Sequence, residues 1–353
     1  MTIPVVSVLV PTFNYAHYIE ECIRSVREQA LEQVEIIVVD DCSTDTTEAV
    51  VAALRGPDLR YVRHETNSGP AVARNTGLAL ARGRYIALLD ADDVMHRDNL
   101  SRKVEILDRH PDVALVHSAA VPIDESGRAL VASPVRGTRA GGVQLQNAFP
   151  RILYTNPVIA SAAVVRKDAI DRVGGFDASL RRAEDWDLWV RLARSFLFAY
   201  LDEQLVRVRI HTRGNQWDSF ATGHDFQAAA ATLRKVFEEF RLEDEGFSLT
   251  RIYWDLYYDK LGNKFGVLPP LSFAKLYVDG LRHDPAAALR VPGIKAGIKL
   301  AACMVLPRSV IQSWRLRRQA RQIAGGRREG HERLWLKHPI GSRDKDVQRR
   351  AAV

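Results

Sequence analysis

Three carboxylates crowd the end of one short apolar run. Tyr85 to Leu89 has the composition of a buried strand, and it is followed by Asp90, Asp92 and Asp93 within four positions. Carboxylates this close repel one another unless a cation lies between them, and a hard divalent ion with oxygen ligands is the commonest such cation. Ligands of open α/β sheets bind beyond the carboxyl ends of the strands, where this cluster falls. The alternative is a solvated acidic turn that caps a helix beginning near Arg97.

The chain around this cluster repeats strand, polar turn and helix. Each strand is a short run rich in β-branched residues, and each helix shows apolar residues at helical spacing. The predicted strands are Val5 to Val10, Val34 to Val39, Leu59 to Arg63, Tyr85 to Leu89 and Val113 to Ser118. This order predicts an α/β fold with a mostly parallel sheet and helices on both of its faces.

Acidic residues also end the second strand, at Asp40, Asp41 and Asp45. Asp45 stands three residues before Glu48, as in a capping box, so we interpret Asp45 as structural and keep Asp40 and Asp41 as ligand candidates. The chain contains neither the G-x-G-x-x-G turn of dinucleotide folds nor a P-loop. Carboxylates at successive strand ends suit a nucleotide whose diphosphate is held through a metal ion.

The second half of the chain changes rhythm. Residues 119–157 hold several glycines and prolines, which predict a hairpin and a loop followed by a short helix. A strand is expected from Val158 to Val165 and a helix from Lys167 to Val173. Another helix opens with Glu184-Asp185-Trp186-Asp187. Acids in a first helical turn are often partners of the helix dipole, but carboxylates beside tryptophan rings are also desolvated, which suits a general base.

Five motifs in this order resemble the family 2 glycosyltransferases of the GT-A fold, over about the first 215 residues. They are Pro11-Thr12-Phe13-Asn14, Val39 to Asp45, Asn67 to Gly77 with its Gly-Pro-Ala-Val-Ala-Arg-Asn core, Asp90-Ala91-Asp92-Asp93, and Glu184 to Trp189. The resemblance implies an inverting enzyme that moves a sugar from a nucleotide-diphosphate donor to a hydroxyl group. It also implies a GT-A type sheet flanked by helices, followed here by a C-terminal helical extension.

The same resemblance implies a role for each matching residue. Asp185 would be the catalytic base, and Asp92 would bind a divalent metal, Mg²⁺ or Mn²⁺. The donor would contact Thr12, Asn14, Asp40, Asp41, Arg74, Asp90, Asp93 and Glu184.

A further match lies at Val208 to His211, similar to a strand of the family that ends in a histidine able to reach the metal or the diphosphate. We hold His211 as a second metal ligand, with a surface histidine as the alternative. Two positions depart from the family. Cys42 stands where the family commonly has glycine, and Trp186 where it often has tyrosine.

The charge of the chain is concentrated at its end. From Arg308 onward there are 13 Lys and Arg against 4 Asp and Glu, while the preceding residues carry 37 against 39. We expect a catalytic domain over 1–218, a helical region over 219–324 and a disordered basic tail over 325–353. The helical region either packs on the catalytic domain or lies on an anionic membrane surface, since apolar, aromatic and clustered basic residues occur together there.

Composition sets the remaining limits. A chain of 353 residues with 46% hydrophobic and 26% charged residues can fold as one α/β domain with an appendage. Its three scattered cysteines indicate neither a disulfide framework nor a zinc site. The N-terminus resembles a first strand rather than an export signal, and no window is apolar enough to span a membrane. We therefore expect a cytoplasmic protein, free or peripheral on the inner face of the cell membrane.

Other functions fit the sequence less well. A sugar-phosphate nucleotidylyltransferase needs a glycine-rich basic loop, which Pro11 to Asn14 do not provide. A non-catalytic nucleotide-sugar-binding subunit would be expected to lack an acid from positions 90–93 or Asp185, and all are present. No nucleic-acid-binding module accompanies the basic tail. The expected partners are a nucleotide-diphosphate sugar and a glycan or lipid-linked glycan acceptor.

Overall fold

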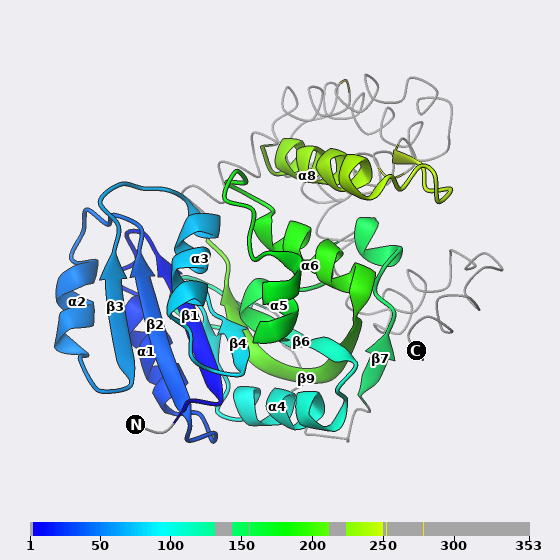
Figure 1. Cartoon of the computed structure of the whole chain (residues 1–353). Coiled ribbons are helices and arrows are strands. Elements are labelled where there is room, and N and C mark those ends of the chain that lie inside the picture. The colour runs from blue at the N-terminus through cyan, green and yellow to red at the C-terminus, as the bar shows by residue number, and fades with distance from the viewer. Residues whose placement is uncertain are drawn as a thin grey trace, which may run out of the picture.

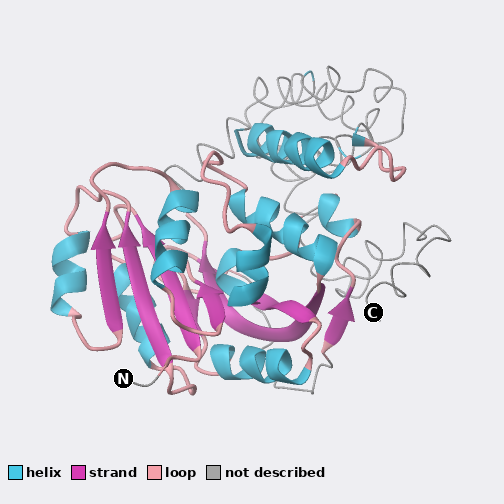
Figure 2. Ribbon diagram, viewed as in Figure 1, coloured by secondary structure: helices cyan, strands magenta, loops and turns pink. Residues whose placement is uncertain are grey.

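The computed structural model describes residues 3–130, 143–154, 156–211 and 224–249, together with Ile252 and Val278. Among these residues, nine strands form one sheet with helices on both faces (Figures 1 and 2). Eight strands follow the order β3-β2-β1-β4-β8-β6-β9-β5, and β7 pairs with β9. The predicted α/β fold with a sheet flanked by helices is confirmed.

The N-terminal half of the sheet is parallel, as expected. It consists of β1 (Val6–Thr12), β2 (Val34–Asp40), β3 (Leu59–Arg63) and β4 (Tyr85–Leu88). The register pairs Thr12 with Asp40 and Leu9 with Leu88, so the turns after β1, β2 and β4 meet at one edge. The helices between these strands are α1 (Ile19–Arg27), α2 (Thr47–Ala53) and α3 (Pro70–Leu80).

The other half of the sheet is mixed, so the parallel content is smaller than predicted. β8 (Ala163–Arg166) runs antiparallel between β4 and β6 (Val113–Ile123). β6 pairs in parallel with β9 (Leu197–Arg209), and two short strands, β5 (Val94–Met95) and β7 (Gln144–Gln146), are antiparallel to β9. The parallel pairing of the N-terminal half stops at β4 because β8, which comes from later in the chain, lies antiparallel between β4 and β6.

Alternate residues of the strands feed two apolar cores on opposite faces of the sheet. Leu9, Ile37 and Val39 face one core, which is covered by α3, α5 (Lys167–Val173), α6 (Glu184–Ser195) and α8 (His224–Phe240). Val8, Val10 and Val38 face the other, which is covered by α1, α2 and α4 (Asn99–Arg109). Two short 3₁₀ helices, η1 (Arg151–Leu153) and η2 (Ala160–Ala162), lie between β7 and β8. The predicted strand from Val158 therefore begins later, at Ala163.

The helical pattern predicted after the catalytic part is confirmed over His224–Phe240, where Leu233, Val236 and Phe237 are buried. Lys235 attaches this helix to the rest of the protein through ion pairs with Asp177 and Asp187. The remainder of 219–324 and the tail 325–353 lie outside the described residues, apart from 241–249, Ile252 and Val278. Within the part of the chain that the structure describes, no helix is long and apolar enough to cross a membrane.

Lys103 on α4 is fully buried, and its Nζ donates to the carbonyl oxygen of Ala162 at 2.7 Å. Burial lowers the pKa of Lys103 to about 7. The unfolded chain keeps this proton up to about pH 10.4. Between these values the unfolded state binds more protons than the folded state, so the lysine makes stability rise with pH.

We therefore expect Lys103→Met to flatten the rise in stability between pH 7 and pH 9. Urea unfolding midpoints at pH 6, 7.5 and 9 measure this, and Lys167→Met, which removes a surface lysine from α5, is the matched control. A Lys103→Met variant that kept the slope of the unsubstituted protein would contradict the assignment.

Candidate functional site

The candidate site lies at the carboxyl edge of the parallel strands and is joined to α6 by one arginine. Arg74 of α3 is 5% exposed. Its Nη2 donates to Asp90 Oδ1 at 2.8 Å and its Nη1 donates to Glu184 Oε1. The guanidinium also lies over the ring of Phe176, 5.7 Å from the centroid. One buried cation therefore connects the acidic cluster after β4 with the predicted catalytic helix.

The predicted metal ligands Asp92 and His211 are in direct contact. His211 Nε2 lies 2.7 Å from Asp92 Oδ2, and both side chains are largely buried, at 13% and 6% exposed. The rings of Tyr15 and Tyr18 lie 6.1 and 5.6 Å from the imidazole. The sequence had left a surface position as the alternative for His211, and the structure instead places this residue in the acidic cluster.

The pKa values of the other two acids of the cluster, Asp90 and Asp93, reflect burial and repulsion from neighbouring carboxylates. Burial raises the pKa of Asp93 well above its usual range, and the nearby Asp90 and Asp92 raise it further. Burial also raises the pKa of Asp90, with Arg74 acting in the opposite direction. The backbone N–H of Arg209 donates to Asp93 at 2.9 Å. The cluster therefore carries more negative charge than its protein neighbours balance.

A divalent metal could bind to Asp92 and His211 if a bound substrate supplied further ligands. An oxygen of Asp92 and a nitrogen of His211 are suitable ligands for Mn²⁺ or Mg²⁺. Among the described residues, no group of three or more His, Cys, Asp or Glu side chains could hold a metal ion. Such an ion would take its remaining ligands from phosphate oxygens and water, as magnesium commonly does in sites that bind nucleotides.

Asp185 differs from its acidic neighbours in having no cationic partner among the described residues. Its Oδ2 accepts from Asn156 Nδ2 at 3.2 Å and its Oδ1 from the Trp186 backbone N–H at 2.7 Å. Burial, and then the charge of Glu184, raise the pKa of Asp185 to about 6. A carboxyl group with this pKa, tied only by neutral donors, can accept a proton near neutral pH.

The two neighbouring acids are engaged elsewhere. Glu184 is paired with Arg74. Asp187 is fully buried and accepts from Arg191 at 2.6 and 2.8 Å and from Lys235 at 3.0 Å. Of the three acids in the first turn of α6, Asp185 is therefore the one whose carboxylate is not committed to a cation.

The predicted nucleoside residues organise the turns at the strand ends. Asp41 accepts the backbone N–H groups of Ser68 and Gly69 at 2.9 and 2.7 Å, and it contacts His64. Asp40 is fully buried and accepts from the Ser43 N–H and the Tyr61 hydroxyl, both at 2.7 Å. Both acids therefore hold the protein's own loops.

The first turn is built in the same way. The amide oxygen of Asn14 accepts from the Thr44 N–H at 2.7 Å, while the buried hydroxyl of Thr12 has no partner among the described atoms. Asp45 is structural, as predicted, but it bonds the N–H of Thr47 at 3.0 Å instead of forming a capping box with Glu48.

Two residues beside the site have a left-handed backbone, which side chains other than glycine and asparagine rarely adopt. Cys42 has φ +70°, a conformation that glycine adopts without strain, so the glycine that the family resemblance implies at this position would also fit. Ala183 has φ +58° and directly precedes Glu184, so the strained residue turns the chain into α6. Strain of this kind commonly accompanies functional sites.

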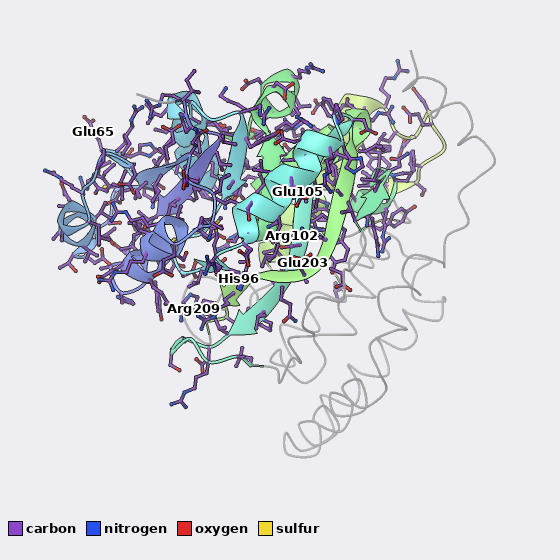
Figure 3. All side chains as sticks on the ribbon, turned by 90° about the horizontal axis from the view of Figure 1, so that it is seen from below. Glu65, His96, Arg102, Glu105, Glu203 and Arg209 are labelled. Carbon is purple, nitrogen blue, oxygen red and sulfur yellow. The ribbon has the colours of Figure 1, made fainter. Side chains whose placement is uncertain are left out.

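Three residues that were not predicted from the sequence support the site. Asn156 bonds Asp185, Ser161 Oγ accepts the Asp90 N–H at 3.0 Å, and Arg209 donates to the Asp92 carbonyl oxygen at 2.9 Å. Arg209, at the end of β9, is labelled in Figure 3. The sequence offered one signal for Arg209. It lies two residues before His211, so both side chains are on the same face of an extended segment. The contacts of Asn156 and Ser161 depend on folding over 29 and 71 residues of chain.

The similarities of the chain agree with this geometry. A glycosyltransferase of Rickettsia conorii that is described as uncharacterized is 31% identical over 205 residues, which are 58% of this chain and 33% of the relative. The succinoglycan biosynthesis protein ExoO of Rhizobium meliloti is 44% identical over 106 residues, 30% of each chain. The chain thus spans about a third of the length of these relatives.

A solved structure shares the fold. The mannosyltransferase PcManGT from Pyrobaculum calidifontis, in complex with GDP-Man and Mn²⁺, aligns with 86% of this chain and 87% of its own, at a TM-score of 0.53 and 23% identity. Residues 7–174 match the sequence family described as "Glycosyl transferase family 2". This match covers just under half of the chain, and the solved structure shows the same fold, which is the GT-A type that the motifs predicted.

Proposed function

We propose that this chain is an inverting glycosyltransferase that moves a sugar from a nucleotide-diphosphate donor to a hydroxyl group of a glycan or lipid-linked glycan. The observation that carries the proposal is the arrangement around Arg74, which joins the acids of the donor side to the turn that presents Asp185. The relative named for succinoglycan biosynthesis and the similar structure with GDP-Man and Mn²⁺ support a role in glycan synthesis and a nucleotide-sugar donor.

Asp185 is the base in this proposal. Inversion requires the acceptor oxygen to attack from the face opposite the leaving group, and one carboxylate then takes its proton. The raised pKa of Asp185 makes this carboxylate a stronger proton acceptor than an exposed aspartate. The hydrogen bonds from Asn156 and the Trp186 N–H hold its orientation.

Asp92 and His211 would hold the metal, and Asp90 would face the ribose and sugar of the donor. A divalent ion there supplies Lewis-acid stabilisation of the diphosphate leaving group. We extend the donor site to Thr12, Asn14, Asp40 and Asp41 through the turns that they organise. The roles of Arg74, Asp93 and Glu184 are then to fix and balance the acids that face the donor.

A screen of nucleotide sugars for Mn²⁺-dependent hydrolysis tests the activity directly. Release of a nucleoside diphosphate from one donor, dependent on added metal, is the expected result. An enzyme that released none from UDP-, GDP- or dTDP-linked sugars, with or without candidate acceptors, would contradict the proposed reaction.

Asp92→Asn removes one charged ligand while preserving the shape of the side chain. We expect turnover to fall by at least ~10²-fold, since several kcal/mol of charge stabilisation depend on the ion. Calorimetric titration with the donor, with and without Mn²⁺, measures the cause. Asp98→Asn, the same change at an exposed position ahead of α4, is the control. Equal donor affinity of the unsubstituted protein in both conditions would exclude a bridging metal.

Asp185→Asn should leave donor binding intact and reduce transfer by on the order of 10² to 10⁴-fold, the range of general-base catalysis. In the unsubstituted enzyme, kcat/KM should rise with pH through about 6, because the base acts only when deprotonated. The contrasting variant is Asp187→Asn, which should lower the melting temperature more than the turnover of folded protein. Near-normal transfer by Asp185→Asn would move the base elsewhere.

We further propose that 1–218 form the catalytic domain and that residues after about Pro285, which lie outside the described residues, bind the cytoplasmic leaflet. Each Lys or Arg near an anionic surface contributes roughly 1 kcal/mol, so a few of the 13 basic residues after position 307 would suffice at low salt. Co-sedimentation with anionic and neutral vesicles should show salt-sensitive binding to the anionic vesicles only. Equal binding to anionic vesicles by a chain truncated before Pro285 would contradict this proposal.

A further inference from the structure

We propose that Arg209 is a positioning residue for the metal site. Arg209 holds Asp92 against His211 and does not contact the ion itself. This inference rests on the proposed metal-assisted function. It deepens that function by assigning the geometry of the two ligands to a third residue.

Arg209 is buried, and its side chain donates hydrogen bonds to several protein oxygens. Its side chain is 2% exposed, and its Nε donates to the Asp92 carbonyl oxygen at 2.9 Å. Nη1 donates to the carbonyl oxygens of Asp124 and Glu125, both at 3.1 Å, and Nη2 donates to Glu21 Oε2 at 2.7 Å. Each nitrogen of the guanidinium group therefore has a protein acceptor, and four of its five N–H groups are engaged by the protein.

These contacts tie the acidic cluster to the strand that carries His211. The backbone N–H of Arg209 donates to Asp93 Oδ1, so the same residue holds the cluster through both its main chain and its side chain. Arg209 and His211 lie two residues apart, on the same face of an extended chain. A shift of the Asp92 backbone relative to β9 would separate Asp92 Oδ2 from His211 Nε2, and the Nε contact opposes this shift.

The Tyr18 ring completes the connection. The guanidinium carbon of Arg209 lies 4.4 Å from the centroid of this ring, and the His211 ring lies 5.6 Å from it. Tyr18 immediately precedes α1, and Glu21 lies within that helix. Arg209 therefore fixes the cluster against three segments at once, namely β9, the turn at 124–125, and α1.

Outer residues that orient metal ligands typically change metal affinity by ~10 to 100-fold when they are substituted. Arg209→Lys keeps the positive charge but loses the planar fork that reaches several acceptors at once. A role in positioning therefore predicts weaker metal binding in this variant, although its charge is unchanged. A role limited to charge balance predicts no such loss.

Arg207 provides a matched control on the same strand face. Its side chain is 43% exposed, lies 3.8 Å from Glu21 and donates to the Gly127 carbonyl oxygen. It therefore shares the helix and the turn with Arg209, but none of its contacts reaches the Asp92 backbone. Arg207→Lys should retain the metal affinity of the unsubstituted protein.

The experiment titrates Mn²⁺ into the full chain and follows free Mn²⁺ by electron paramagnetic resonance, in the presence of UDP and, separately, of GDP. We expect Arg209→Lys to bind Mn²⁺ about tenfold more weakly or worse, and Arg207→Lys to match the unsubstituted protein. Melting curves show whether each variant is folded at the temperature of the titration. Glu21→Gln, at a half-exposed helix position, removes the negative charge from one acceptor of the guanidinium and should give a smaller loss.

Equal Mn²⁺ affinity of folded Arg209→Lys and the unsubstituted protein would overturn the proposal. If Arg209→Lys does not fold, the Glu21→Gln variant decides, and an affinity equal to that of the unsubstituted protein overturns it. An unsubstituted protein that binds no Mn²⁺ with either nucleotide would instead refute the metal-assisted function on which the inference rests.

Discussion

Repulsion among buried carboxylates is the constraint on which the site depends. Asp90, Asp92 and Asp93 follow one strand, and Glu184 and Asp185 approach them from α6. Burial makes each charge costly, and each neighbouring charge adds to the cost. Arg74 offsets part of it by pairing with an acid from each group. Burial and the neighbouring acids nevertheless raise the pKa values of Asp90, Asp93 and Asp185, with Arg74 acting in the opposite direction on Asp90 and Asp185.

This imbalance has a consequence for the substrate. A nucleotide diphosphate is itself strongly negative, and a cluster of carboxylates would repel it. A divalent ion held by Asp92 and His211 would reverse the sign of the local potential toward the phosphates. In the proposed reaction, the donor and the metal would therefore bind together, because the ion offsets the repulsion between the acids and the diphosphate.

The sequence predicted the parts of this arrangement that depend on local pattern. The strand ends, the acidic turns and the opening of α6 follow from hydrophobic runs and their polar stops, and the family resemblance supplied roles for Asp92 and Asp185. The antiparallel strands β5 and β7 were missed because runs of two or three residues carry no periodic signal. Arg209 and Asn156 were missed because their importance lies in contacts across 117 and 29 residues of chain. No sequence pattern predicts such contacts for a basic residue in a strand or for an asparagine in a loop.

The three acids that open α6 show how environment separates chemically similar groups. Glu184 faces Arg74, and Asp187 faces Arg191 and Lys235. Lys235 belongs to α8, so this helix helps to neutralise an acid in the first turn of α6. Asp187 lies two residues from Asp185, so its pairing with Arg191 and Lys235 limits the negative charge close to Asp185. Helix α8 therefore affects the electrostatics around Asp185, the proposed base.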